Sequence, residues 1–304
     1  MKISVCIATY KRPERLGILL QELTKQELLP HEVVVVDNDH SMSAAPVVES
    51  QSAASPFAIH YAVQPERNIA LTRNRTVELA SGDWIAFIDD DERAPAEWLR
   101  LLMQAALDHG ADGVLGPVLP QVPSHAPAWI RRGRFYDFPR MATGQVVPLN
   151  RMRFGNVVVR TSTLRSEPGP FDVSYGLTTG EDADMLIRLV RKGAKIIWCD
   201  EAIVLEPVEE SRLSLKWLLQ RAVSGGQEFA RKTVNGKYGP ITLLGRISFA
   251  VKATLQLAMS SVLALISLPA GRHLAAQWLL RASANLGKLS VFWGWRYSEY
   301  AKTA

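Results

Sequence analysis

The chain has 304 residues, of which 47% are hydrophobic and 21% are charged, and its formal net charge is +5 at pH 7. This composition excludes a disordered protein, and the length suits one large domain with an appendage. Cys6 and Cys199 make neither a disulfide framework nor a thiolate zinc site, so we interpret them as buried residues in a reducing compartment.

The first half of the chain alternates short β-branched runs with amphipathic helical patterns. Strands are predicted at residues 3–8, 33–36, 58–63, 84–88 and 113–118. Helices are predicted at residues 13–27, 70–80 and 95–109, with Pro13 and Pro95 in the first turn, where proline is tolerated. The fold class predicted is therefore α/β, with a mostly parallel sheet flanked by helices.

The middle of the chain has a different character. Residues 117–150 are rich in proline, arginine and aromatic residues and follow neither period, so we expect a long functional loop. Trp129, Phe135 and the neighbouring arginines are candidates for ligand contacts, and packing of the loop on its own domain is an equal alternative. A strand at 154–160, a helix at 181–192 and a strand at 195–198 are expected to follow.

The C-terminal region is basic and apolar. No acidic residue occurs between Phe229 and Ser298, whereas lysines and arginines recur throughout. Residues 253–271 carry no charge and reach the length of a membrane span, and tryptophans and tyrosines flank the apolar patterns. We expect helices that lie on or dip into the cytoplasmic leaflet, with lipid favoured over nucleic acid. A buried helical subdomain is the alternative.

The most informative segment is the run of acids from Asp89 to Glu92, which directly follows an apolar strand. In open α/β sheets, ligands bind at the carboxyl ends of strands. Adjacent carboxylates repel one another unless a cation lies among them, and such oxygen ligands suit Mg²⁺ or Mn²⁺ together with substrate phosphates. The run predicts a divalent-cation site, with a solvated acidic turn as the alternative.

Three further elements carry polar groups at expected strand or helix ends. Asp37 ends a strand and can accept a hydrogen bond from a nucleobase or cap a turn. A helix start contains three arginines, including Arg73, and could cradle a diphosphate or form a solvated basic face. Glu181 and Asp182 open a helix, where the helix dipole favours acids with or without a catalytic role.

In this order and spacing, the elements resemble the family 2 glycosyltransferases over residues 2–231. The resemblance implies a Rossmann-like GT-A fold with an inverting mechanism. It assigns the donor-binding role to Thr9, Tyr10, Arg12, Asp37, Asn68, Arg73, Asp89, Asp90 and Asn156. It further implies that Asp91, with Asp89, binds the metal and that Asp182, beside Glu181 in the catalytic motif, is the general base. Glu206 stands where many relatives have a metal-binding histidine.

The resemblance also implies the reaction and its setting. We expect transfer of a hexose from a nucleotide sugar, preferably a UDP-sugar, to a lipid-linked or polysaccharide-precursor acceptor, with Mg²⁺ or Mn²⁺. The processive Gln-x-x-Arg-Trp motif is missing, so one sugar per encounter is expected. The pattern after Trp198 is similar to bacterial exopolysaccharide enzymes of the succinoglycan type. The expected domains are a catalytic region, residues 1–232, and a membrane-associating region, residues 233–304.

The N-terminal apolar run is too short for a signal peptide, so we expect a peripheral or monotopic protein at the cytoplasmic face of the inner membrane. Three other readings compete with glycosyl transfer. A nucleotidyltransferase would need a glycine-rich basic loop after the first strand, and a nicotinamide-dependent oxidoreductase would need G-x-G-x-x-G there. A nucleotide-sugar-binding, catalytically weak membrane scaffold would have lost Asp89, Asp91 and Asp182, which are all present.

Overall fold

The computed structural model describes residues 1–175 and 180–295. The chain forms two compact units, one of Met1–Leu119 with Phe138–Glu206 and one of Pro120–Asp137 with Pro207–Ala304. This division follows packing. The boundary expected between residues 232 and 233 is a different one, because it separates a catalytic region from a membrane-associating region. That boundary stays a prediction.

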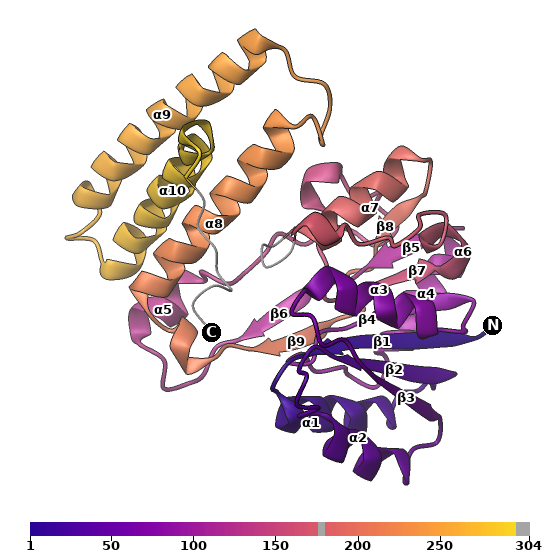
Figure 1. The fold of residues 1–304 in the computed structure, drawn as a ribbon. Helices are drawn as coiled ribbons and strands as arrows, with labels where there is room; N and C mark the ends of the chain where they lie inside the picture. The colour runs from indigo at the N-terminus through magenta and orange to yellow at the C-terminus, as the bar shows by residue number, and fades with distance from the viewer. Residues whose placement is uncertain (176–179, 296–304) are drawn as a thin grey trace. The chain divides into compact units, whose positions relative to one another are not determined.

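Among the described residues, a seven-stranded sheet forms the frame of the first unit, in the order β3-β2-β1-β4-β7-β5-β8 (Figure 1). Its strands are β1 (Ile3–Thr9), β2 (Glu32–Asp37), β3 (Ala58–Val63), β4 (Trp84–Phe87), β5 (Gly113–Leu115), β7 (Val157–Arg160) and β8 (Ile196–Trp198). Neighbouring strands pair in parallel except at β7, which is antiparallel to both β4 and β5. The predicted mostly parallel sheet is confirmed.

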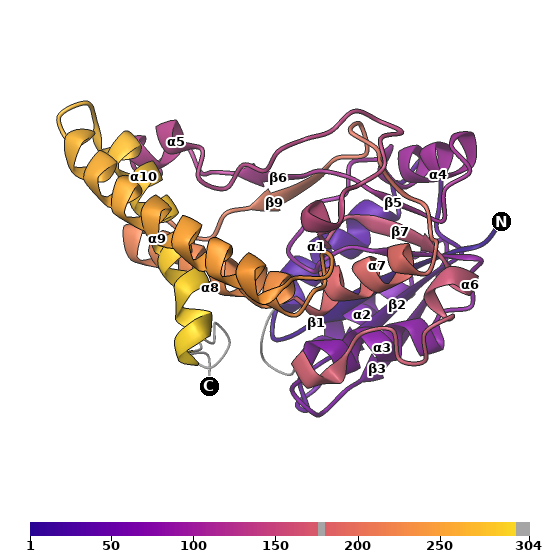
Figure 2. The ribbon, with the colours of Figure 1, turned by 90° about the horizontal axis from the view of Figure 1, so that it is seen from above.

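Helices cover both faces of this sheet (Figures 1 and 2). One face carries α1 (Pro13–Leu23), α2 (Ala45–Ser52) and α4 (Trp98–Asp108). The other carries α3 (Ile69–Leu79), α6 (Thr161–Leu164) and α7 (Glu181–Arg191). The α/β class predicted from the alternating patterns is therefore correct. The helix α2 was not predicted, because its eight residues provide only one buried apolar position, Val48.

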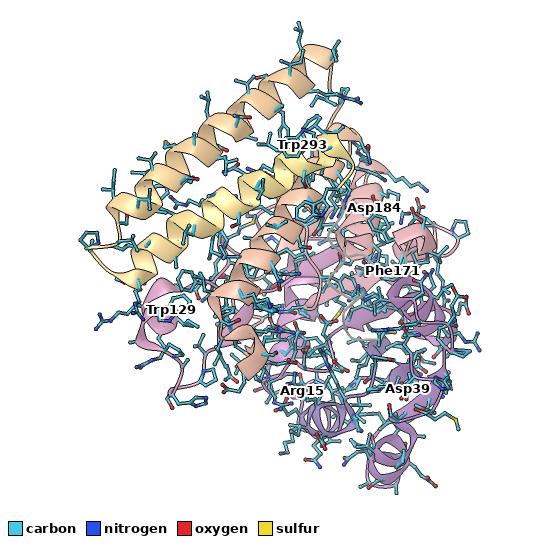
Figure 3. All side chains as sticks on the ribbon, turned by 60° about the vertical axis from the view of Figure 1, so that its left-hand side comes forward. Arg15, Asp39, Trp129, Phe171, Asp184 and Trp293 are labelled. Atoms are coloured by element: carbon cyan, nitrogen blue, oxygen red, sulfur yellow. The ribbon has the colours of Figure 1, made fainter. Side chains whose placement is uncertain are left out.

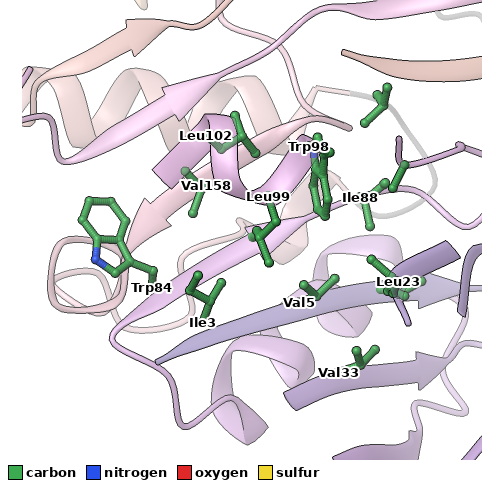
Figure 4. Packing of buried hydrophobic residues seen from close by; sticks show 14 of the residues in the cluster. Ile3, Val5, Leu23, Val33, Trp84, Ile88, Trp98, Leu99, Leu102 and Val158 are labelled. Atoms are coloured by element: carbon green, nitrogen blue, oxygen red, sulfur yellow. The ribbon is translucent and has the colours of Figure 1, made fainter. Parts of the chain in front are cut away.

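The hydrophobic core lies between the sheet and the layer of α1, α2 and α4 (Figure 4). Side chains alternate along a strand, so Ile3, Val5 and Ile7 of β1 all enter this core. Leucines at helical spacing in α1 meet them, and each fully buried leucine contributes about 1.5–3 kcal/mol. The alternate residue Cys6 faces α3 instead, with its Sγ 3.6 Å from the carbonyl oxygen of Thr76.

The order of the strands places the site. The chain moves outward from β1 through β2 to β3 and then returns to form β4 on the other side of β1. Such a reversal leaves the carboxyl ends of β1 and β4 side by side at the edge where α/β proteins bind ligands. Thr9 at the end of β1 and the acids that follow β4 consequently share this edge.

Several predicted boundaries were wrong for local reasons. The strand expected at 113–118 stops at Leu115, since Pro117 has no N–H to continue the ladder. Between them, Gly116 passes close to the Ala202 carbonyl oxygen, where a Cβ would lie only 2.3 Å away. The strand expected at 154–160 begins only at Val157, since Gly155 has a φ of +100°. The loop expected at 117–150 contains β6 (Val118–Gln121), α5 (Ala128–Gly133) and the 3-10 helix η1 (Leu149–Arg151). The strand β6 pairs with β9 (Val204–Pro207).

The second unit consists mainly of α8 (Leu215–Val234), α9 (Leu243–Ile266) and α10 (Arg272–Ser290). Figure 2 shows these three helices from above. The helix α10 packs against α5, α8 and α9. The approach of α8 and α10 is close at two glycines, because a Cβ on Gly226 would lie 2.0 Å from the Ala284 carbonyl oxygen and one on Gly287 would lie 2.2 Å from that of Val223.

Two adjacent glycines of α8 provide a matched test of this close contact. Gly226→Ala is expected to destabilise the protein by about 1–3 kcal/mol, since the helices must move apart. Gly225→Ala meets nothing within 4 Å and should stabilise α8 by about 0.4–1 kcal/mol through the lost backbone freedom of the unfolded chain. Thermal unfolding of both variants measures the difference. Equal melting temperatures would contradict the close packing of α8 on α10.

Candidate active site

The carboxyl ends of β1 and β4 bring together residues that are far apart in sequence. Thr9 Oγ1 donates a hydrogen bond to Asp90 Oδ2 at 2.7 Å. Arg12 Nη1 lies 3.0 Å from Asp90 Oδ1 and 2.9 Å from Asp91 Oδ2. Arg15, nearly one turn further along α1, lies 3.5 Å from Asp91 Oδ2. The chain therefore gathers Thr9 and Arg12 with the acidic run, and it compensates the acids with two guanidinium groups.

Asp89 lies where the acidic groups of this edge meet. Burial raises the pKa of Asp89, and the Arg73 guanidinium opposes that shift. The charges of Asp91, Asp182 and Glu206 raise the pKa further. The Asp89 side chain is 44% exposed, so water screens part of these interactions. Charges from the acidic run and from the start of α7 therefore both act on Asp89, as is expected if the two motifs form one active site.

Asp90 and Glu92, in the same acidic run, are more deeply buried than Asp89. Burial raises the pKa of Asp90 to about 6, and Arg12 beside it opposes the shift. Burial, followed by the charge of Asp89, raises the pKa of Glu92 well above its ordinary value. Glu92 Oε2 accepts a hydrogen bond from the Asp89 backbone N–H at 3.1 Å. A Cβ on Gly155 would lie 2.6 Å from Glu92 Oε1, so glycine is needed where the chain passes this acid.

Arg73 connects the acidic run after β4 with the start of α7. Its Nη1 donates to Glu181 Oε1 at 2.5 Å and lies 3.6 Å from Asp182 Oδ2. Its Nη2 donates to Asp89 Oδ1 at 3.3 Å. The guanidinium carbon also lies 4.4 Å from the ring centroid of Phe154. One buried cation therefore contacts both acidic motifs of the predicted site.

The first turn of α7 presents Asp182. Gly180 caps the helix with a φ of +111°, which favours glycine, and the two predicted residues before it, Thr178 and Thr179, lie outside the described residues. The Asp182 side chain is 26% exposed, whereas that of Glu181 is 4% exposed. Asp182 is therefore partly accessible to solvent, whereas Glu181 has the surroundings of a buried ion-pair partner. The role of Asp182 as general base stays a prediction.

One further turn of α7 ties the helix to the segment before it. Asp184 and Arg188 form an ion pair at 3.0 Å, and Arg188 Nη1 donates to Glu167 at 2.5 Å. Figure 3 labels Asp184 and Phe171 in this part of the unit. These contacts support the backbone on which Asp182 is presented.

Two predicted donor-binding residues, Asp37 at the end of β2 and Tyr10 just after β1, contact other groups of the protein. The Asp37 carboxylate is fully buried and accepts hydrogen bonds from the N–H groups of Asp39 and Ala44, both at 2.9 Å, and from the Tyr61 hydroxyl at 3.1 Å. This arrangement is that of a turn-stabilising residue, which was the alternative for Asp37. The Tyr10 ring lies under the guanidinium of Arg67, 5.0 Å from its carbon. Contact of Asp37 or Tyr10 with a nucleoside stays a prediction.

Two asparagines of the predicted donor site also have protein partners. Asn68 caps α3 by accepting from the Ala70 N–H at 3.0 Å. Asn156 is 2% exposed; its Oδ1 accepts from Trp98 Nε1 at 2.8 Å, and its Nδ2 donates to the carbonyl oxygens of Pro117 and Ala202. Both side chains hold the backbone around the site, and direct donor contact stays a prediction.

The carboxylates at this edge are the kind of oxygen ligand that suits a hard cation. Among residues 1–175 and 180–295, no group of three or more histidine, cysteine, aspartate or glutamate side chains is arranged to hold a metal ion. The charges of Asp91 and Glu206 both act on Asp89, and Arg12 and Arg15 lie against Oδ2 of Asp91. Carboxylate oxygens are the ligands that Mg²⁺ and Mn²⁺ take in proteins, so these three acids fit such an ion by their chemistry.

Several residues at this edge of the sheet were not predicted from the sequence. Arg15 is three positions after Arg12 on a helix, a spacing that could have indicated a shared face. Phe154 and Phe171 contact each other at 5.6 Å between ring centroids, and no local pattern indicates that pair. A separate cavity of about 370 Å³ is lined by Glu22, Lys25, Arg93, Ala94, Pro95, Ala96 and Leu205, none of which is a predicted site residue.

Of the loop expected at 117–150, residues 120–137 belong to the second unit, and these include the candidates for acceptor contacts. Trp129 contacts the Phe135 ring at 5.5 Å between centroids, and Arg131 Nε donates to the Ala126 carbonyl oxygen. The Tyr136 hydroxyl donates to the carbonyl oxygen of Arg212 at 2.8 Å. The loop therefore packs within its own unit, and its contact with an acceptor stays a prediction.

A mostly parallel sheet with acids at its switch point, joined through a buried arginine to a second acidic motif, has the architecture of a GT-A glycosyltransferase. Solved structures that share this fold include a mannosyltransferase and a fragment of TarS. The mannosyltransferase PcManGT from Pyrobaculum calidifontis, solved with GDP-Man and Mn²⁺, has a TM-score of 0.66 at 16% identity and covers 97% of this chain and 88% of its own. TarS 1–349 from S. aureus, solved with UDP-GlcNAc, has a TM-score of 0.55 at 17% identity and covers 98% and 93%.

The family model named Glycosyl transferase family 2 matches residues 4–165. Succinoglycan biosynthesis protein ExoM from Rhizobium meliloti (strain 1021) is 35% identical over 79% of this chain and 77% of its own length. The chain therefore belongs to glycosyl transferase family 2, and it is a glycosyltransferase. This membership decides against the nucleotidyltransferase, oxidoreductase and scaffold readings.

Proposed function

We propose that the protein transfers one hexose per encounter from a UDP-sugar to a lipid-linked glycan, with inversion at the anomeric carbon and with Mg²⁺ or Mn²⁺. The observation that carries this proposal is the link between Asp89 and the Glu181–Asp182 pair through Arg73. This link brings the acidic run that we propose binds the metal and the partly exposed carboxylate of Asp182 to the same edge of the sheet. The similarity to ExoM supports an acceptor in exopolysaccharide synthesis, and the shared fold with TarS, solved with UDP-GlcNAc, supports UDP.

The residues take separate roles in this reaction. Asp91 and Asp89, with Glu206 beside them, are the groups that would hold the divalent cation, which when bound neutralises charge on the departing diphosphate. Arg12 and Arg15 lie against Asp91 and are placed to help neutralise the negative charge of the departing diphosphate. Asp182 takes the proton of the acceptor hydroxyl as that oxygen attacks the anomeric carbon. One displacement inverts the configuration, so no enzyme nucleophile is needed.

A screen of donor hydrolysis over nucleotide sugars tests the reaction class and the cation together. We expect hydrolysis of one UDP-sugar with Mn²⁺ or Mg²⁺ and its loss with a chelator. Equal turnover in chelator would contradict the metal assignment. Hydrolysis of GDP-sugars alone would contradict the choice of UDP, and hydrolysis of none in the presence of acceptor would contradict the proposed function.

The proposed membrane partner follows from α9. This helix of 24 residues has a mean hydropathy of 1.7 in its most apolar window, of which 17% is buried, and it is the one helix in the described parts of the chain that is long and apolar enough to cross a membrane. Ala253, Ser260 and Ala264 are its buried positions. Its exposed apolar residues are Leu243, Leu244, Ile247, Val251, Leu255, Met259, Val262, Leu265 and Ile266. Figure 3 shows side chains projecting along α9.

We propose that this exposed face binds the cytoplasmic leaflet, where a lipid-linked acceptor is found. The surrounding sequence supplies cations without acids from Phe229 to Ser298, which suits anionic lipid. A membrane-spanning arrangement and a peripheral one both bury these side chains, and the small buried residues of α9 favour contact with protein on its opposite face.

Liposome co-sedimentation tests the membrane proposal. Leu255→Glu combined with Val262→Glu should weaken binding to vesicles containing phosphatidylglycerol at least about tenfold, because two apolar side chains lose their burial in lipid. The matched control is Leu107→Glu, at an exposed leucine of α4 in the first unit. Equal binding by the control and the double variant, or no sedimentation of the wild-type chain, would contradict the proposal.

A further inference from the structure

We propose that Arg73 is a positioning residue, which holds the general base at the start of α7 against the acidic run after β4, and that it acts on turnover rather than on donor affinity. The inference rests on the proposed function, in which Asp182 is the base. It departs from the resemblance, which places Arg73 among the residues that line the donor.

The contacts of Arg73 are divided between the two motifs. Nη1 faces α7, with Glu181 Oε1 at 2.5 Å and Asp182 Oδ2 at 3.6 Å, whereas Nη2 faces Asp89 Oδ1 at 3.3 Å. A guanidinium is planar and rigid, so two directed contacts through different nitrogens restrict the positions of both partners. The distance between Asp89 and the start of α7 is consequently tied to the geometry of one side chain.

Aromatic rings hold the guanidinium in place. Its carbon lies 4.4 Å from the centroid of Phe154 and 5.9 Å from that of Phe171, and the two rings meet edge to face. The Arg73 side chain is 9% exposed and that of Glu181 is 4% exposed. Loss of the cation would remove the guanidinium that lies closest to the buried Glu181 carboxylate in the contacts described above, so we expect the first turn of α7 to move toward water.

The helix that carries Arg73 is itself fixed to the segment leading to α7. The next residue, Asn74, donates to the Phe171 carbonyl oxygen at 2.8 Å and accepts from the Phe171 N–H at 2.9 Å. At the start of the same helix, Asn68 Nδ2 donates to the Val173 carbonyl oxygen at 3.1 Å. These hydrogen bonds hold residues 171–173 against α3. The contacts of Arg73 hold Asp182 against the same helix.

The test compares Arg73→Met with Arg75→Met. Arg75 lies on the same helix but is 45% exposed and pairs with Glu78. We expect Arg73→Met to lower kcat about 10- to 100-fold, as displacement of a catalytic group by about 1 Å does, and to change the donor KM less than about threefold. Arg75→Met should leave both constants unchanged. Guanidinium ion added to Arg73→Ala should restore part of the lost kcat, which a general loss of folding would not allow.

Other outcomes overturn the inference. A donor KM that rises with kcat unchanged would show that Arg73 contacts the donor, and an unchanged kcat would show that it positions nothing. If Arg73→Met does not fold, Arg73→Lys keeps the charge without the planar fork and should show the same fall in kcat with a smaller change in melting temperature; wild-type kcat in that variant would overturn the inference.

Failure of the proposed function would be recognised separately, because the wild-type chain would then transfer no sugar from any donor. Hydrogen exchange at residues 181–184 still tests the positioning in that event. Faster exchange in Arg73→Met than in Arg75→Met supports it, and equal exchange overturns it.

Discussion

Replacing Asp182 with asparagine is expected to abolish sugar transfer while donor binding remains nearly intact. The amide cannot take the proton of the acceptor hydroxyl, and a positioned base contributes about 10²–10⁴ in rate. Asparagine keeps the size of the side chain and can still accept the hydrogen bond that Asp182 Oδ1 receives from the Ala183 N–H. Transfer rate with acceptor and donor affinity by titration calorimetry measure the two effects.

The control for this substitution is Asp108→Asn, at the exposed end of α4, where the carboxylate accepts a surface hydrogen bond from Gln104 Nε2 at 2.8 Å. It removes the same charge far from the acidic motifs in sequence and should leave transfer unchanged. Transfer by Asp182→Asn at the wild-type rate would remove Asp182 from the role of base. A large loss of donor affinity would instead assign Asp182 to donor binding.

Asp91→Ala is expected to act at an earlier step, by weakening the metal-dependent part of donor binding. Asp91 is 7% exposed and lies next to two guanidinium groups, so its removal leaves an excess of positive charge and too few carboxylates for a divalent cation. Donor affinity of the wild-type chain should fall at least about tenfold when Mn²⁺ is replaced by chelator, a difference of about 1.4 kcal/mol. The affinity of Asp91→Ala should be the same in both conditions.

The comparison between metal and chelator within one variant separates cation binding from general damage to the fold. Arg12 and Arg15 lose a partner in Asp91→Ala, so a melting curve should accompany the titration. Asp108→Ala serves as the matched control and should keep the wild-type response to chelator. If Asp91→Ala retains that response in full, Asp91 does not bind the cation.

The fold could be predicted to the extent that its signals are local. The run Val33–Val36 is fully buried in β2, and the β-branched residues that indicated a strand are the ones that fill the sheet. The ends of elements depended on distant atoms. At Gly116, just after β5 ends, the backbone passes so close to the Ala202 carbonyl oxygen that a Cβ would lie 2.3 Å from it, and nothing near residue 116 in sequence indicates that contact.

The site shows the same division. The acids at the end of β4 were evident from their position behind an apolar run, and the structure places them at the switch point as expected. For Asp37 and Asn156, the residue types agree with the family pattern, yet their polar atoms are bonded to protein groups. Hydrogen-bond saturation depends on neighbours from several strands and helices, so it could not be read from either residue alone.

The sequence by itself determined the class of fold, the acidic motifs and the family, because hydrophobic periodicity and the order of short motifs are properties of the chain read in one dimension. Only the tertiary structure decided which charges meet. Arg73 was one of three arginines near a helix start, and packing alone selects it to lie between Asp89 and Glu181. The reason is that Coulomb energy depends on distance and burial, which folding sets for residues far apart in sequence.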